Sequence, residues 1–305
     1  MRPPRTRLLS GRSLVIGVPF VWLLLSFLLP FLIVLKISFS ETDISNPFGT
    51  LFSYVDDVLI MKLKLGNYAF IAKDELYLLT YLSSLKYAAL TTVLCLLIGY
   101  PFAYFMARAR ASLRPILLMM VMLPFWTSFL LRIYAWKGIL SNDGLLNRLL
   151  LDLHLIDAPL QIMNTPVSMM IGLVYAYLPF MILPLYANLA KLDLRYLEAA
   201  ADLGATPWQT FWRVTVPLSR SGIVAGAMLV FFPTIGEYVI PELLGGPSTL
   251  MIGRVLWDEF FTNNDWPMAS AVTVVVILLI LAPLVWFNRY QTAQDSGAQG
   301  GGGHE

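Results

Sequence analysis

The sequence predicts an all-α integral membrane protein with about six transmembrane helices. Of the 305 residues, 58% are hydrophobic and 13% are charged, and the mean hydropathy is +0.70. Soluble domains are typically about half apolar and about a quarter charged, so this chain has too few charges for a surface that faces water on all sides. Its apolar runs reach about 20 residues, the length of a helix that crosses the hydrocarbon core of a bilayer.

Six apolar segments account for the expected spans. They are residues 14–35, 84–107, 115–136, 167–190, 221–240 and 269–287. The first follows a basic N-terminus, as a secretory signal does, but it is long enough to cross a bilayer and no small-residue cleavage site follows it. We therefore interpret it as a retained helix and expect a membrane domain at 14–290, after a cytoplasmic tail at 1–13. The Gly-rich tail at 291–305 is expected to be disordered.

The distribution of charge predicts the orientation of these spans. If the N-terminus lies in the cytoplasm, both tails and the loops 108–114 and 191–220 lie there as well. These segments hold about 12 of the 21 Lys and Arg residues but only about 5 of the 19 acids, which is the bias of the positive-inside rule. The outer loops then have a net negative charge, which favours cationic solutes or partners. The net charge of the whole chain is only +2, so nothing indicates nucleic-acid binding.

The sequence lacks the residue patterns of several other functions. Cys95 is the single cysteine and lies in an apolar run, so we interpret it as a small buried hydrophobe. His154 and His304 do not have the spacing of a metal site. No Gly-x-x-x-x-Gly-Lys-[Ser/Thr] pattern occurs, so the chain is not expected to hydrolyse ATP itself. No set of side chains suggests catalysis, and we expect a protein that is not an enzyme.

The loop at 191–220 has the local signals of two short helices joined by a bend. Asp193 is a plausible N-cap of the first helix. Gly204 suits the left-handed residue that follows a helix. Thr206 and Pro207 then read as the N-cap and the first residue of the second helix, whose apolar stripe is formed by Trp208, Phe211 and Trp212.

The same loop contains a longer pattern. Glu-Ala-Ala is followed by three residues, Gly, nine residues, and then two aliphatic residues one position apart and a proline. The residues are Glu198, Ala199, Ala200, Gly204, Val214, Val216 and Pro217. This pattern resembles the cytoplasmic loop of the permeases of binding-protein-dependent ABC importers, where Ile and Leu are more usual at the two aliphatic positions. An interfacial amphipathic hairpin is the alternative interpretation.

The resemblance implies a type I ABC importer permease fold with a coupling helix–turn–helix. In that family the first short helix docks in a groove of an ATPase subunit. The small alanines would allow close approach, Glu198 would offer a charge, and Gly204 would permit the bend. The implied partners are two copies of an ABC ATPase that holds ATP and Mg, a second homologous permease subunit and a periplasmic binding protein. The implied location is the bacterial inner membrane, with both termini in the cytoplasm. Pro217 is expected to end the second short helix.

The resemblance extends to the polyamine branch of these permeases. Leu123–Trp136, Leu173–Phe180 and Gly236–Gly246 look like the corresponding segments of that branch, and the match runs from about Val15 to about Trp286. It implies polyamine import, with putrescine favoured and the spermidine/putrescine permeases as close relatives.

A cationic diamine needs acceptors along its path, and two acids lie near the outer end of the fifth span. Burial of Glu237 costs several kcal/mol unless it faces water or a cation, so it is a candidate pathway residue; an interfacial position or pairing with Arg132 is the alternative. Glu242 follows at the expected outer mouth of the substrate path. Arg132 itself either snorkels to the outer surface or pairs with an acid. Nearby rings either face ammonium groups or form an interfacial belt. They are Tyr134, Trp136, Tyr175, Tyr177 and Tyr238.

A secondary transporter of a small cation, driven by an ion gradient, is the alternative function. Such carriers place ion sites near the midplane and often contain inverted repeats. The sequence has no convincing repeat and no acid within a span apart from Glu237. The ABC importer permease is therefore the favoured prediction.

Overall fold

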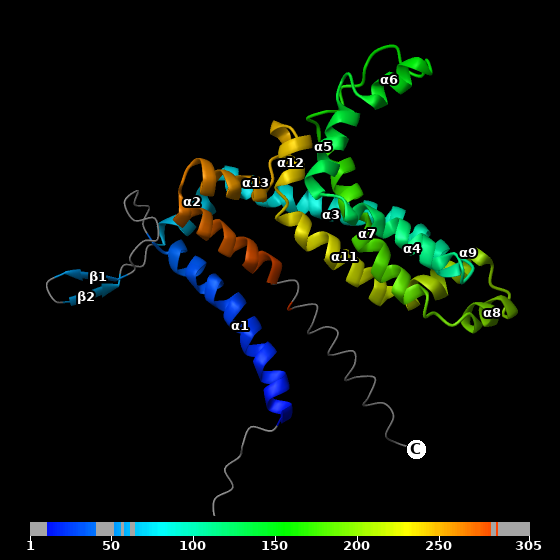
Figure 1. The fold of residues 1–305 in the computed structure, drawn as a ribbon, viewed down its shortest axis with the longest axis horizontal. Coiled ribbons are helices and arrows are strands. Elements are labelled where there is room, and N and C mark those ends of the chain that lie inside the picture. The colour runs from blue at the N-terminus through cyan, green and yellow to red at the C-terminus, as the bar shows by residue number, and fades with distance from the viewer. Residues whose placement is uncertain (1–10, 41–51, 56–57, 62–64, 282–284, 286–305) are drawn as a thin grey trace, which may run out of the picture. The chain divides into compact units, whose positions relative to one another are not determined.

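Apolar helices form almost all of the computed structural model (Figure 1), which describes residues 11–40, 52–55, 58–61, 65–281 and 285. The chain divides into two units. One contains Met1–Asp74 and Leu256–Glu305, and the other is Glu75–Val255. Among the described residues, α1 (Gly11–Ser38), α3 (Glu75–Arg108) and α7 (Pro166–Leu189) are single helices that are long and apolar enough to cross a membrane.

In the unit Glu75–Val255, α3 and α7 pack against each other and against α11 (Arg220–Ile235), as Figure 1 shows. Their contacts bury a continuous apolar core in which Cys95 and Met181 are inaccessible to solvent. The position of Cys95 agrees with its interpretation as a buried hydrophobe. The unit therefore has a helical core with two ends, from which the shorter elements extend.

The third expected span, 115–136, is wrong as a straight helix. It consists of α4 (Arg114–Met122), a 3-10 turn η1 (Leu123–Trp126) and α5 (Phe129–Leu140), with a bend of 90° between the pair of segments. Pro124 lies in the first turn of η1, and Thr127 and Ser128 are extended, so the helical hydrogen bonds stop there. A further short helix, α6 (Leu145–Asp152), follows the turn after α5.

The fifth expected span, 221–240, is also shorter than predicted, because α11 ends at Ile235. Three residues separate it from α12 (Val239–Leu244), and the chain continues through η3 (Pro247–Thr249), α13 (Ile252–Trp257) and the π-helical turn η4 (Asp258–Thr262). The α12 helix packs against α5 and α7.

The other unit contains α1, the hairpin β1 (Phe52–Val55) and β2 (Val58–Met61), α2 (Gly66–Lys73) and the helix Trp266–Leu281. The hairpin is antiparallel, with Phe52 opposite Met61, and is a small addition to the all-α fold. Apolar side chains on α1 are exposed, as they are in a helix that faces lipid. The sixth expected span, 269–287, begins in the helix Trp266–Leu281 and continues outside the described residues, where the tails 1–10 and 291–305 also lie.

Candidate functional site

The loop 191–220 folds as the two short helices that the sequence predicts. The first is α8 (Arg195–Asp202). The N-cap prediction for Asp193 is off by one position, because Leu194 occupies that place. The Asp193 carboxylate nevertheless accepts a hydrogen bond of 3.0 Å from the backbone N–H of Arg195, so it still satisfies a free donor at the start of α8.

The bend and the start of the second helix are confirmed. Gly204 has a φ of +80°, a conformation that costs little only for glycine. Thr206 then caps α9 (Pro207–Thr210): its hydroxyl accepts from the N–H of Gln209, and the Gln209 side chain accepts from the N–H of Thr206. This reciprocal pair fixes the direction in which the second helix leaves the bend.

The second helix does not end at Pro217 as predicted. It continues from α9 through the π-helical turn η2 (Phe211–Thr215) into α10 (Val216–Leu218), and the chain then bends by 66° at Ser219 to enter α11. Pro217 is the second residue of α10, and the helix ends one residue later, at Leu218.

The two halves of the motif have different surroundings. Glu198, Ala199 and Gly204 are exposed and Ala200 is half-buried, whereas Val214, Val216 and Pro217 are all half-buried. The α8 helix packs against α9 and η2. The first part of the motif, Glu198 to Gly204, is therefore accessible to another molecule. The last part, Val214 to Pro217, packs the loop against the rest of the unit.

Sequence reasoning missed two apolar side chains on the exposed face of the loop. Leu203 is 89% exposed and Tyr196 is 58% exposed. Apolar side chains that are exposed next to charged ones are frequent at protein–protein contacts. Tyr196 lies in the first turn of α8 and Leu203 directly follows the helix.

The opposite end of the same unit holds Glu237, in the connection between α11 and α12. The Tyr177 hydroxyl donates a hydrogen bond of 2.5 Å to Glu237 Oε2. Glu237 Oε1 accepts from the N–H groups of Val239, at 3.0 Å, and Ile240, at 3.4 Å. A carboxylate at this position stabilises the start of α12, and its two oxygens have partners within this unit.

Arg132 is not the partner of Glu237 in the described part of the chain. Its guanidinium carbon lies 5.7 Å from the ring centroids of both Phe125 and Phe129. This arrangement is a cation–π contact, and the sequence alternatives for Arg132 did not include it.

Glu242 forms an ion pair that sequence reasoning missed. Its Oε2 lies 2.8 Å from Nε of Arg254, and both side chains are partly exposed. The Arg254 N–H does not point at an acceptor among the described residues, so the contact is an ion pair without a directed hydrogen bond. Arg254 carried no sequence signal except that it is a cation in an acidic outer segment.

The helix that carries Glu242 is held firmly by its neighbours. Ile240 and Leu244 of α12 are completely buried. The Ser168 hydroxyl donates a hydrogen bond of 2.7 Å to the carbonyl of Leu244. Gly172 lies so close that a Cβ there would be 2.5 Å from Cδ1 of Leu244.

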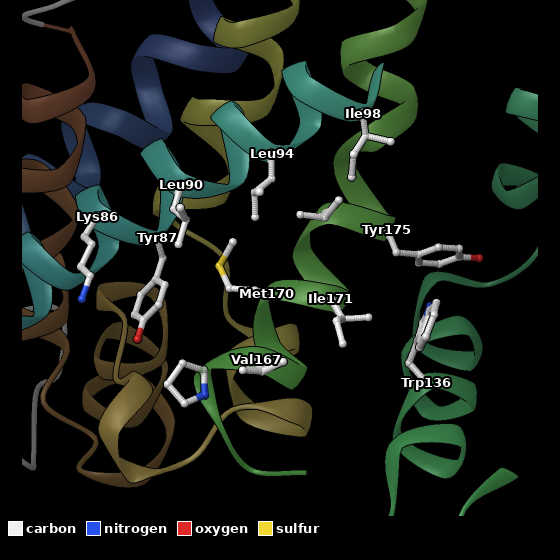
Figure 2. Close-up of a pocket in the computed structure, with 12 residues that line it drawn as sticks. Lys86, Tyr87, Leu90, Leu94, Ile98, Trp136, Val167, Met170, Ile171 and Tyr175 are labelled. Carbon is white, nitrogen blue, oxygen red and sulfur yellow. The ribbon is translucent and has the colours of Figure 1, made fainter. Parts of the chain in front are cut away.

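The candidate aromatic residues do not form one cage around the acids. Trp136 and Tyr175 pack edge to face at 5.3 Å and line an open groove of about 650 Å³ between α3, α5 and α7, as Figure 2 shows. That groove is apolar and its lining contains Lys86 but no carboxylate, which is unfavourable for a cationic ligand. Tyr134 is 54% exposed and Tyr238 is half-buried, whereas Tyr177 contacts the candidate acid Glu237 directly.

An all-α membrane chain whose spans are joined by an exposed, capped helix–turn–helix has the architecture of a transporter permease. Comparison with known families identifies the type. The family described as "Binding-protein-dependent transport system inner membrane component" matches residues 93–293. The chain belongs to this family, whose members are membrane permease subunits of ABC importers and not enzymes.

Curated relatives support the same assignment. The spermidine/putrescine transport system permease protein PotB of Haemophilus influenzae (strain ATCC 51907 / DSM 11121 / KW20 / Rd) is 41% identical over 277 residues, which cover 90% of this chain and 93% of that protein. PotB of Escherichia coli (strain K12) is 43% identical over 242 residues, which cover 78% of this chain and 88% of that protein. The resemblance to the polyamine branch is therefore confirmed.

A solved structure has the same fold. A chain in the crystal structure of a bacterial ABC transporter involved in the import of the acidic polysaccharide alginate matches with a TM-score of 0.63, covering 92% of this chain and 96% of that chain. The two are 18% identical, so the likeness concerns the fold and not the transported solute. The predicted type I permease fold is confirmed.

Proposed function

We propose that this chain is a permease subunit of an ATP-driven importer that moves polyamines, with putrescine as the favoured substrate, across the bacterial inner membrane into the cytoplasm. The observation that carries the proposal is the identity of 41% with a spermidine/putrescine permease over 90% of the chain. The positive-inside bias supports cytoplasmic termini.

In this proposal the loop 191–220 receives the movement of the ATPase. Glu198, Ala199 and Gly204 are exposed, and Leu203 adds apolar area beside them. A surface of small, apolar and acidic side chains suits a groove that is partly apolar and partly basic. The partners are two copies of an ABC ATPase subunit, which hold ATP and Mg, together with a second homologous permease and a periplasmic polyamine-binding protein.

The substrate would enter at the other end of the unit, near α12. A polyamine is a flexible polycation, so its ammonium groups need carboxylates or ring faces. Glu242 is the more available carboxylate, because it is partly exposed and its contact is an ion pair without a directed hydrogen bond. Glu237 and Tyr177 lie in the same segment and provide a second, already hydrogen-bonded acceptor.

Uptake by the reconstituted complex tests this proposal. The permease, its partner permease, the ATPase and the binding protein are placed in liposomes, and entry of labelled putrescine and spermidine is measured with and without ATP. We expect uptake of polyamines that requires both ATP and the ATPase subunit. Uptake that follows an ion gradient without ATP would contradict the proposal. Equal uptake of an anionic solute would contradict the polyamine assignment alone.

A further inference from the structure

Tyr100 of α3 lies against the bend where the coupling loop enters α11. Its hydroxyl oxygen is 2.8 Å from Oγ of Ser219, and both residues are buried. Ser219 in turn donates to the carbonyl of Val216, at 3.1 Å. Because the Ser219 hydrogen is used in that bond, the Tyr100 hydroxyl is the donor to Ser219. A helix that is far away in sequence is thereby hydrogen-bonded to the residue at the centre of the 66° bend.

The same face of α3 also holds the π-helical turn that precedes the bend. The ring of Phe211 meets Tyr100 edge to face at 5.5 Å and Tyr104 at 6.1 Å. The guanidinium of Arg108 lies 5.2 Å from the Tyr104 ring centroid. These three α3 residues are spaced four apart and therefore share one face of the helix. Edge-to-face pairs and cation–π contacts are both favourable arrangements.

The chain connects the coupling loop directly to only two of the three core helices, α7 before it and α11 after it. A displacement of the loop reaches these two through the backbone, but it reaches α3 only through side chains. The Tyr100–Ser219 hydrogen bond has a direction and a fixed length, whereas the aromatic contacts tolerate sliding. The hydrogen bond is therefore the most directional contact between α3 and the bend, in addition to the apolar packing of α3 against α7 and α11.

We infer that Tyr100 is a positioning residue for coupled transport, which transmits the displacement of the loop 191–220 to α3 through Ser219. This inference rests on the proposed coupling role of the loop. The π-helical turn η2 fits such a role. It contains one extra residue per turn, and such turns are frequent at functional sites, so we expect η2 to change its conformation when the loop is displaced. Without the hydrogen bond, α3 follows the bend through its apolar packing against α7 and α11 alone, and therefore less closely.

The test compares uptake with ATP hydrolysis in the reconstituted complex. Tyr100→Phe keeps the ring and removes only the hydroxyl, and Ser219→Ala removes the acceptor from the other side. For each variant, we expect the number of polyamine molecules imported per ATP hydrolysed to fall about five-fold, the factor that corresponds to one buried hydrogen bond. The ATPase subunit should still copurify in normal amount. The double variant should be no worse than either single variant, because both remove the same bond.

Tyr186→Phe is the matched control, since it removes a hydroxyl from a half-buried tyrosine of α7 that lies outside both the coupling loop and the candidate pathway; it should leave the ratio unchanged. An unchanged ratio in both Tyr100→Phe and Ser219→Ala overturns the inference, as does a parallel fall of uptake and hydrolysis. If the wild-type complex itself binds no ATPase, the proposed function fails instead, so the two failures are distinguishable.

Discussion

Tyr177 of α7 donates a hydrogen bond of 2.5 Å to Glu237, which lies between α11 and α12. The other oxygen of the same carboxylate caps α12 through the N–H groups of Val239 and Ile240. One acidic side chain thus connects three helices at the end of the unit where we place substrate entry. The effect of the Glu237 charge and the effect of its hydrogen bond with Tyr177 can be measured separately with two different substitutions.

Glu237→Gln keeps an oxygen acceptor but removes the charge. We expect polyamine uptake to fall while copurification of the ATPase stays normal, because the helix α11 separates Glu237 from the coupling loop. Tyr177→Phe keeps the charge but leaves one carboxylate oxygen without its donor; the expected loss of stability is about 1–3 kcal/mol, measured by thermal unfolding of the purified complex. If Glu237→Gln retains full uptake and the preference for cations, Glu237 is a helix cap and not part of the path.

The pairing of Glu242 with Arg254 gives a prediction about charge at the entrance. Glu242→Gln leaves Arg254 without its counter-ion, so a positive charge faces an incoming cation. The effect of a partly exposed pair is about 1 kcal/mol, so we expect the KM for polyamine delivered by its binding protein to rise about five-fold. Arg254→Gln should change KM in the opposite direction. A KM that moves in the same direction in both variants would show that the pair acts only on stability.

Local chemistry explains which features the sequence could predict. The positive φ of Gly204 and the capping of α9 by Thr206 depend on residues within a few positions of each other. Both were predicted, as were the single helices α3 and α7, whose apolar runs are unbroken. The proposed coupling role of Glu198 and Gly204 depends on the spacing of the motif and on its resemblance to the cytoplasmic loop of the family.

Features that depend on distant contacts were not predicted. The 90° bend between α4 and α5 interrupts an apolar stretch that reads as one span; Pro124 marks the place, but a proline in an apolar run does not by itself distinguish a kinked helix from a broken one. The pairing of Glu242 with Arg254 and the placement of Trp136 in a groove away from the acids both join segments that are separate in sequence. Hydropathy and spacing carry no information about such pairs.

Substitutions at the coupling loop should abolish uptake without removing the protein from the membrane. Glu198→Lys reverses an exposed charge, and Gly204→Asp places a side chain where φ is +80°, at a cost of about 1 kcal/mol. We expect both to lose ATP-driven uptake and ATPase copurification, measured on membranes that contain normal amounts of the permease. Gly204→Asn is the matched control, because asparagine is similar in size but uncharged and tolerates this backbone conformation. Unchanged transport in Glu198→Lys and Gly204→Asp would contradict the coupling role.

The close contact between α7 and α12 predicts a destabilising substitution at Gly172 whose effect a second substitution, at Leu244, should partly offset. A Cβ on Gly172 would lie 2.5 Å from Cδ1 of Leu244 and 3.0 Å from Cγ2 of Ile240. Because this core is already filled, Gly172→Ala must displace the Leu244 and Ile240 side chains or α12 itself, at a cost of about 1–3 kcal/mol. We expect a lower unfolding temperature and slower uptake, since the displaced helix carries Glu242.

Leu244→Ala removes the atom that the new methyl group meets. Alone it leaves a cavity and destabilises the protein by about 2–5 kcal/mol. Combined with Gly172→Ala, it should be less harmful than the sum of the two single changes, because each relieves the packing defect of the other. Additive losses in the double variant would mean that Gly172 does not determine the position of α12, and the entrance would then depend on the Ser168–Leu244 hydrogen bond instead.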